Sequence, residues 1–287
     1  MKIKTIFWII GCFFLLRTAA GGGLWSLAGE DDAIDFGYSG YASVLSRFVD
    51  GRGRVDYAGL KADRGALDEF AGDIAELDRS RFEEWGEADR LAFWINAYNA
   101  LVLKAVIDHY PIRASFFASL RFPRNSIRQI SGGWDEIQFT VMGRMTTLKE
   151  IKDEVIRKEF GEARVHSALA CAAVGGPPLR RAPFTGDGLD GQLDDQVRAM
   201  LGDPGKFHID FNAKVIYLSE IFDWHGEDFI AKYDDSNQPE VRSRKQRAVI
   251  RFLADYAGEE RSKALRSYQY RVAYLDFDWS LNEQERP

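Results

Sequence analysis

The stretch from Arg90 to Tyr110 constrains the fold more than any other part of this sequence. Between Phe93 and Ile107 almost every side chain is apolar, which gives this segment no wide polar face. A helix that is apolar nearly all round is stable only when its surroundings bury it. Pro111 ends it, because the residue before a proline disfavours helical dihedrals. We therefore predict a buried central helix whose polar residues are Asn96, Asn99 and Lys104.

Shorter elements surround this helix in the sequence. Helical spacing of apolar residues predicts helices at Tyr41–Phe48, Leu60–Leu77, Leu148–Phe160 and Glu240–Tyr256. Alternating apolar residues predict hairpins at Glu136–Leu148 and Phe207–Leu218 and a last strand at Arg271–Phe277. Helices and hairpins are interleaved without a regular strand–helix–strand period, which favours an α+β fold over a doubly wound parallel sheet. Because no proline-rich or serine-rich break follows Gly37, we predict one helix-rich domain over 37–284.

The first 20 residues are typical of a secretory signal peptide. Lys2 and Lys4 precede an apolar run from Thr5 to Leu16, and small residues follow up to Ala20. The run is shorter than the roughly 20 residues that a membrane span needs. We expect cleavage after Ala20, a linker over 21–36 and a secreted or periplasmic protein; an uncleaved anchor is the alternative.

Charge and cysteine content exclude several classes of protein. The net charge is −6 and becomes −9 once a cut after Ala20 removes three basic residues, whereas nucleic-acid binders are usually basic. We expect no nucleic-acid partner, and membrane contact only transiently, through the signal peptide. Of the two cysteines, Cys12 leaves with the signal peptide and Cys171 remains. The mature chain then cannot form an internal disulfide.

The segment from His166 to Arg180 holds the first candidate site. Cys171 is a candidate nucleophile, because a thiol near a histidine can be activated for attack. His166 precedes it by five residues, a spacing that places the two side chains apart on either a regular helix or a strand. They meet only if the backbone turns between them; otherwise His225 is the first choice as the base. The alternative is that Cys171 is an inert residue of the core.

Two further groups of residues complete the candidate site. Asn96 and Asn99 share one face of the central helix, where buried amides must find hydrogen-bond partners. They either orient a base or bind substrate, or they clamp neighbouring loops. The expected substrate-binding residues are Tyr98, Arg180 and Trp224.

Four blocks of the sequence resemble the family known as domain of unknown function 547. They are Gly53–Leu60, Leu91–Leu101 with its Phe-Trp-Ile-Asn-x-Tyr-Asn signature, His166-x4-Cys171 with Pro177-Pro178-Leu179, and Tyr274–Asn282. The resemblance implies an exported bacterial member and no particular reaction. Relatives commonly carry a second cysteine where this chain has Gly176, so a dithiol switch is not expected here.

Three functions fit these residues. The leading hypothesis is thiol-dependent hydrolysis or acyl transfer at an amide or ester, with Cys171 attacking, His166 or His225 as base, and Asn96 or Asn99 orienting the base or polarising the carbonyl. The second is a non-catalytic envelope module that binds a peptide, a glycan or a partner protein through its aromatic surface. The ligand we expect is a small molecule, a peptide or a glycan. The third is a mononuclear metal site formed by His166, Cys171 and a carboxylate, although the spacing is unlike that of standard zinc sites. The leading hypothesis needs no cofactor and no metal.

Overall fold

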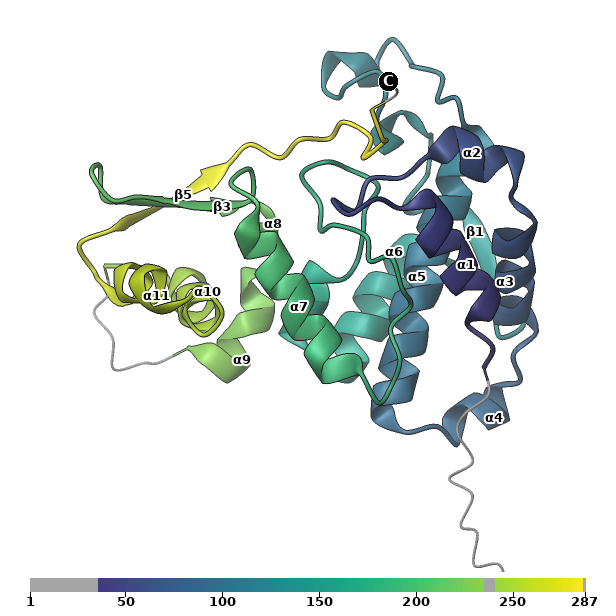
Figure 1. The fold of residues 1–287 in the computed structure, drawn as a ribbon, viewed down its shortest axis with the longest axis horizontal. Coiled ribbons are helices and arrows are strands. Elements are labelled where there is room, and N and C mark those ends of the chain that lie inside the picture. The colour runs from purple at the N-terminus through teal and green to yellow at the C-terminus, as the bar shows by residue number, and fades with distance from the viewer. Residues whose placement is uncertain (1–35, 235–240, 286–287) are drawn as a thin grey trace, which may run out of the picture. The chain divides into compact units, whose positions relative to one another are not determined.

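In the computed structural model the long apolar stretch forms helix α5, Glu87–His109, at the centre of a group of helices (Figure 1). The structure describes residues 36–234 and 241–285, so the predicted signal peptide and nearly all of the predicted linker lie outside it. Sixteen residues of α5 are buried, and Asn96 and Asn99 are 1% and 2% exposed. This helix is the one described element long and apolar enough to cross a membrane, and 89% of its most apolar window is buried inside the protein.

Helices and a hairpin pack around α5. The prediction of one helix over Leu60–Leu77 was wrong, because Asp63 leaves helical dihedrals and splits it into α2 and α3. The apolar residues on the two sides of Asp63 have the spacing expected of one continuous helix, so the sequence did not reveal the break. The helix predicted at Leu148–Phe160 is a short α-helix continued by a π-helix. The elements are α1 (Ser39–Phe48), α2 (Tyr57–Ala62), α3 (Gly65–Glu76), α4 (Arg79–Glu83), η1 (Ala118–Leu120), η2 (Ile127–Gln129), β1 (Gln138–Val141), β2 (Arg144–Thr147), α6 (Leu148–Glu150) and the π-helix η3 (Ile151–Phe160).

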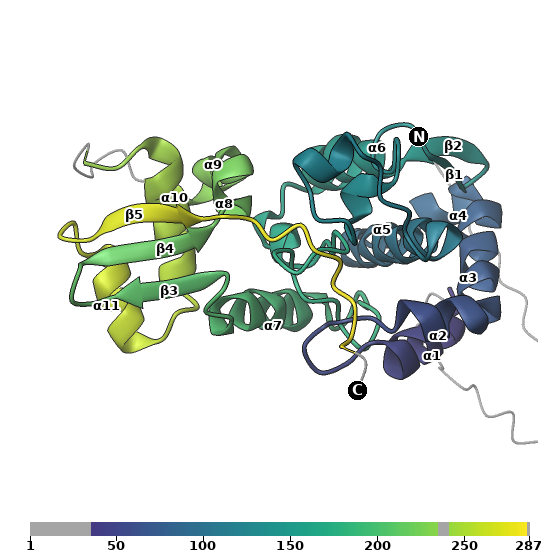
Figure 2. The ribbon, with the colours of Figure 1, turned by 90° about the horizontal axis from the view of Figure 1, so that it is seen from above.

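The second half of the chain adds a three-stranded sheet covered by helices (Figure 2). Strand β4 (Val215–Ser219) pairs antiparallel with β3 (Phe207–Asp210) and parallel with β5 (Arg271–Leu275), so that Val215 lies opposite Arg271. Phe222, Phe229 and Phe252 are almost fully buried in the core of this region. Its helical elements are η4 (Ala163–Ser167), α7 (Leu189–Gly202), α8 (Ile221–Trp224), η5 (Gly226–Phe229), α9 (Ile230–Tyr233), α10 (Arg244–Ala254) and α11 (Glu259–Arg266).

These elements confirm the α+β prediction: the described residues form a mostly helical single domain with a hairpin and a small sheet. Both predicted hairpins are present, and the predicted last strand joins the second of them as β5. After β5 the chain runs back toward α1 and α2 (Figures 1 and 2). There Asn282 accepts a hydrogen bond from the Tyr57 hydroxyl at 2.6 Å and donates one to the Gly53 carbonyl at 3.2 Å.

Asn99 joins α5 to the segment that carries Cys171. Its amide nitrogen donates to the Ala168 carbonyl at 3.0 Å, and its amide oxygen accepts from the Ala170 N–H at 2.9 Å. Asn96 makes the same pair of bonds with the backbone of Phe184, at 2.8 and 2.9 Å. Each asparagine thus hydrogen-bonds to one buried N–H and one buried C=O that have no partner in a β-sheet.

We expect Asn99→Ala to lower the free energy of unfolding by about 2–4 kcal/mol, because two buried backbone groups lose their partners. Urea unfolding measures this loss. The matched control is Asn212→Ala, at an exposed position in the β3–β4 turn, where about 0.5 kcal/mol or less is expected. A loss below about 1 kcal/mol for Asn99→Ala would show that the clamp does not hold this segment.

Candidate functional site

A pocket of about 250 Å³ contains Cys171, His166 and His225. Its walls are mostly apolar and include several aromatic rings, among them the 44% exposed Trp224, which stacks on Trp279 with ring centroids 5.9 Å apart. The lining residues come from α5, the loop after it, η3, η4, α8 and the C-terminal segment: Tyr98, Arg128, Trp134, Lys152, His166, Leu169, Cys171, Pro177, Ile221, Trp224, His225, Phe277 and Trp279.

The backbone turns between His166 and Cys171, which is the condition for their side chains to reach the same site. His166 belongs to the 3₁₀ turn η4, which ends at Ser167, and the irregular segment that follows is held by Asn99. Ala172, directly after the cysteine, has a left-handed φ of 52°. Both side chains consequently reach the same pocket although neither regular spacing would allow it.

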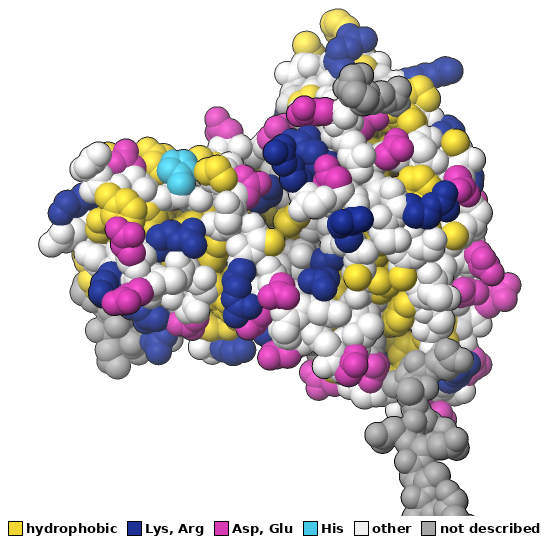
Figure 3. Space-filling model, viewed as in Figure 1, with side chains coloured by type: hydrophobic (Ala, Val, Ile, Leu, Met, Phe, Trp, Pro, Cys, Tyr) yellow, Lys and Arg dark blue, Asp and Glu magenta, His cyan; other side chains and the backbone are white. Residues whose placement is uncertain are grey.

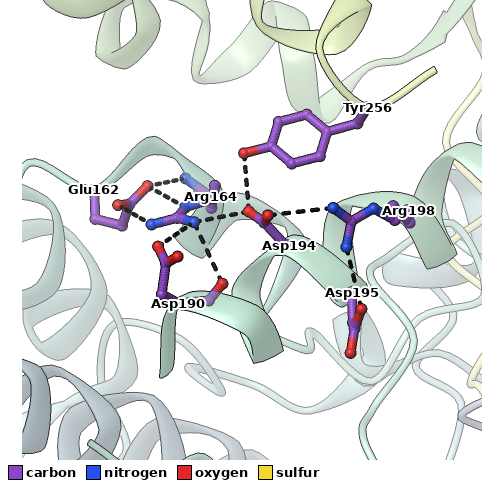
Figure 4. Close-up of polar contacts among 7 residues, drawn as sticks. All are labelled: Glu162, Arg164, Asp190, Asp194, Asp195, Arg198 and Tyr256. Atoms are coloured by element: carbon purple, nitrogen blue, oxygen red, sulfur yellow. Dashed lines mark hydrogen bonds and ion pairs between the residues drawn. The ribbon is translucent and has the colours of Figure 1, made fainter. Parts of the chain in front are cut away.

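Arg164 fixes the turn that carries His166 (Figure 4). Its guanidinium lies among three carboxylates and is held 2.8 Å from Glu162 and 2.7 Å from both Asp190 and Asp194. The Tyr256 hydroxyl donates to Asp194 at 3.0 Å and so ties the cluster to the residues that follow α10. With its side chain only 13% exposed, Arg164 connects η4 to α7.

His166 is oriented by a carboxylate. Its Nε2 lies 2.7 Å from Asp228 Oδ2, and its side chain is 3% exposed. Arg157 donates to both oxygens of Asp228, at 2.6 and 2.9 Å, and this charge lowers the pKa of Asp228 together with the hydrogen bond from His166. Burial lowers the pKa of His166, which is therefore neutral at pH 7, with Nε2 as the donor toward Asp228.

The ring of His225 stacks on the ring of His166. The centroids are 4.2 Å apart and the planes differ by 7°. Burial and the neighbouring imidazole lower the pKa of His225 to about 2, so it stays neutral over the physiological range. Its Nδ1 is buried and has no hydrogen-bond partner in the described part of the chain.

Cys171 is half-buried, and no hydrogen bond joins its Sγ to either histidine within the described residues. Burial raises the pKa of the thiol to about 11, although Lys152 opposes the shift. At neutral pH the site therefore holds a protonated thiol and two neutral imidazoles, not a thiolate–imidazolium pair.

Two cations face the same pocket. Burial lowers the pKa of Lys152, and Arg128 lies over the rings of Trp279 and Phe122 at 5.2 and 4.8 Å. Neither forms an ion pair among residues 36–234 and 241–285. The pocket thus combines aromatic rings with two basic side chains that make no direct ion pair in the described part of the chain.

The predicted site residues divide into three groups. Cys171, His166, His225, Tyr98 and Trp224 all line the pocket. Asn96 and Asn99 are buried behind it and bind backbone, which matches the loop-clamp alternative. Arg180 lines a separate groove and lies over the ring of Phe184 at 5.2 Å.

Sequence reasoning missed several residues of the pocket and of the groups that hold its side chains. Asp228, which binds His166, was not among the predicted site residues. Lys152 and Arg157 lie in the π-helix η3, whose hydrogen-bonding pattern cannot be read from apolar spacing. Arg128 lies in the short 3₁₀ turn η2, and Trp134 and Trp279 lie outside helices and strands. Only their residue types, cationic and aromatic, could have drawn attention to them.

The residues that could hold a metal differ from the predicted set. His166, His225 and Asp228 offer ligand atoms within 4.8 Å of one another, and this group contains no sulfur. A zinc ion binds about 2.0–2.1 Å from each imidazole nitrogen, near the plane of each ring. Two parallel rings 4.2 Å apart do not share such a position, and Arg157 already engages both oxygens of Asp228. The observed arrangement fits a hydrogen-bonded dyad better than a metal centre.

Residues 82–201 match the family model described as "Protein of unknown function, DUF547". This part of the chain is therefore a DUF547 family domain. The match includes the Asn96–Asn99 helix and the His166–Cys171 segment, whereas His225 and Asp228 lie beyond it. No curated protein and no solved structure matches the chain.

Gly176 provides a test of the geometry around the thiol. A Cβ built there would lie 2.4 Å from Cys171 Sγ, so a cysteine at this position would meet the existing sulfur after a small shift. We expect Gly176→Cys to form a disulfide in air and to lose both titratable thiols of the described region until it is reduced. Thiol titration and peptide mapping measure this. The matched control is Gly191→Cys, on an open surface of α7, which should remain a free thiol. Persistence of both free thiols after oxidation would show that Cys171 points elsewhere.

Proposed function

We propose that this protein is a thiol-dependent acyl hydrolase or transferase that acts on an amide or ester. The observation that carries the proposal is that Cys171 shares a pocket with His166, while Asp228 holds Nε2 of that imidazole at 2.7 Å. A carboxylate on one imidazole nitrogen fixes the ring and stabilises the imidazolium that forms when the other nitrogen takes a proton. His166 is accordingly the general base of this proposal, and the weakly basic His225 is not.

The proposed reaction proceeds through a thioester. As Cys171 Sγ attacks the carbonyl carbon, its proton passes to Nδ1 of His166. The tetrahedral intermediate then expels the amine or alcohol, which leaves with that proton. Water, activated by the same imidazole, hydrolyses the thioester and releases the acid; a second nucleophile in place of water gives acyl transfer.

The raised pKa of the thiol makes the base essential at neutral pH. A thiol with a pKa of about 11 offers almost no thiolate near pH 7, so attack depends on proton removal during the step. Lys152 lies in the same pocket and supplies positive charge for the developing oxyanion. Arg128 and the aromatic walls favour an acyl group that carries a carboxylate and a flat or apolar face.

We expect p-nitrophenyl acetate to acetylate Cys171, and we expect His166→Ala to slow this step about 100-fold at pH 7.5. The difference should shrink as the pH approaches 11, because the thiolate then forms without the base. Release of p-nitrophenol and peptide mass spectrometry measure the rate and the site. Asp228→Asn should give a smaller loss with the same dependence on pH.

The controls separate catalysis from folding. His208→Ala removes a half-buried histidine outside the pocket and should leave the rate unchanged. Cys171→Ala should abolish the adduct while urea unfolding shows a folded protein. Equal acetylation of the wild type and Cys171→Ala, or a pH-independent effect of His166→Ala, would contradict the proposal. Either result would favour the alternative hypothesis, a non-catalytic module that binds a ligand in this pocket.

We also propose that the chain is exported and processed after Ala20, as the basic, apolar and small-residue regions of its first 20 residues indicate. Expression of the full chain in a bacterium should place a product that begins at Gly21 in the periplasm or the medium, as N-terminal sequencing would show. Phe14→Asp, which interrupts the apolar run, should keep the chain in the cytoplasm. Recovery of the intact N-terminus in the membrane fraction would instead indicate an anchor.

A further inference from the structure

The loop between α5 and β1 exposes a group of apolar side chains. Phe116, Phe117 and Leu120 are 76%, 79% and 71% exposed, which are three of the four highest values among the large apolar residues of the described chain. They lie within five residues of one another on and before the 3₁₀ turn η1, and the two phenylalanine rings are in edge contact at 5.6 Å. Scattered apolar residues are normal on a surface, but a cluster marks a binding face.

Positive charge surrounds this cluster. From His109 to Trp134 the chain has four arginines and no acidic residue, although its net charge is −6. Arg113, Arg121 and Arg124 form no ion pair within the described residues. Hydrophobic and basic side chains gather together at the top of the face in Figure 3, where this loop lies in the view of Figure 1. Glu283, the acidic residue that lines a pocket with Arg124, is already bonded to the Tyr110 hydroxyl.

The loop is held in its exposed shape from within. Gln129 is only 7% exposed, and its amide accepts from the Ser115 N–H at 2.9 Å and donates to the Pro123 carbonyl at 2.9 Å. The buried Gln129 amide thus hydrogen-bonds to both ends of the segment that contains the exposed apolar residues. Because these hydrogen bonds fix the backbone of the loop, Phe116 and Phe117 stay exposed in the folded protein.

We propose that Phe116, Phe117 and Leu120 insert into the interface of a membrane rich in anionic lipid, with Arg113, Arg121 and Arg124 at the level of the headgroups. Apolar side chains that enter the interface, together with arginines that attract anionic lipid, are the two contributions that give stable peripheral binding. The lack of acidic residues between His109 and Trp134 favours an anionic lipid surface as the partner over a protein surface of mixed charge. In this proposal the folded domain also contacts a membrane, whereas the sequence predicted such contact only through the signal peptide.

Vesicle sedimentation tests this proposal with the chain that begins at Gly21, because an apolar leader would bind vesicles by itself. Vesicles of phosphatidylcholine with about 30% phosphatidylglycerol should bind the protein at least about 10-fold better than pure phosphatidylcholine, and added salt should weaken the binding. The combined variant F116S/F117S/L120S and the combined variant R113Q/R121Q/R124Q should each reduce binding about 10-fold or more.

Matched variants elsewhere control for exposure and charge. Val241→Ser replaces a 73% exposed apolar residue, and R79Q/R144Q/R271Q removes three exposed arginines; both should bind as the wild type does. Failure of the wild type to bind either vesicle, or equal binding by the loop variants, would overturn the proposal. A concentration-dependent dimer that the loop variants abolish, seen by ultracentrifugation without lipid binding, would also overturn it and assign the surface to a second copy of the chain.

Discussion

The candidate site depends on two asparagine amides projecting from a helix that is otherwise apolar. Asn99 and Asn96 each replace a missing strand partner for one N–H and one C=O of an irregular segment. Because the helix is rigid and buried, its amides give the segments around Ala170 and Phe184 fixed positions that their own sequences do not specify. An irregular backbone can therefore hold Cys171 at the wall of a pocket, where a helix or strand would have separated it from His166.

Segments distant in the sequence complete the same arrangement. The Val174 and Gly175 N–H groups donate to the carbonyls of Ser280 and Asp278 at 2.8 and 2.9 Å, and the Asn282 N–H donates to Ala172 at 3.3 Å. The C-terminal segment thus closes over the residues that follow the thiol, and Trp279 joins the pocket wall as it does so. This packing links the blocks Gly53–Leu60 and Tyr274–Asn282, outside the DUF547 match, to the segment inside it.

The sequence predicted the parts of the fold that follow a regular period. The apolar stretch of α5 and both hairpins could be read directly, because burial imposes one pattern on a helix and another on a strand. The Asp63 break and the π-helix η3 leave that pattern nearly unchanged and were not foreseen. In the site, residue chemistry pointed to Cys171, His166 and His225, whereas the assignment of Asp228 to His166 needed a contact across 62 residues. Arg180 shows the opposite failure, since proximity in the sequence to Cys171 did not bring its side chain into the same pocket.

The protonation state of the site limits the chemistry that it can perform. Burial holds both histidines neutral and the thiol protonated, so the resting pocket contains no ion pair between its sulfur and nitrogen groups. The basic side chains that line it are instead Lys152 and Arg128. A bound carboxylate beside Arg128 would exclude water, and an oxyanion forming near Lys152 would gain more from that charge in the drier pocket than in the open one. In this resting state the Cys171 thiol is a weak nucleophile, and it becomes a strong one only when a neighbouring base removes its proton.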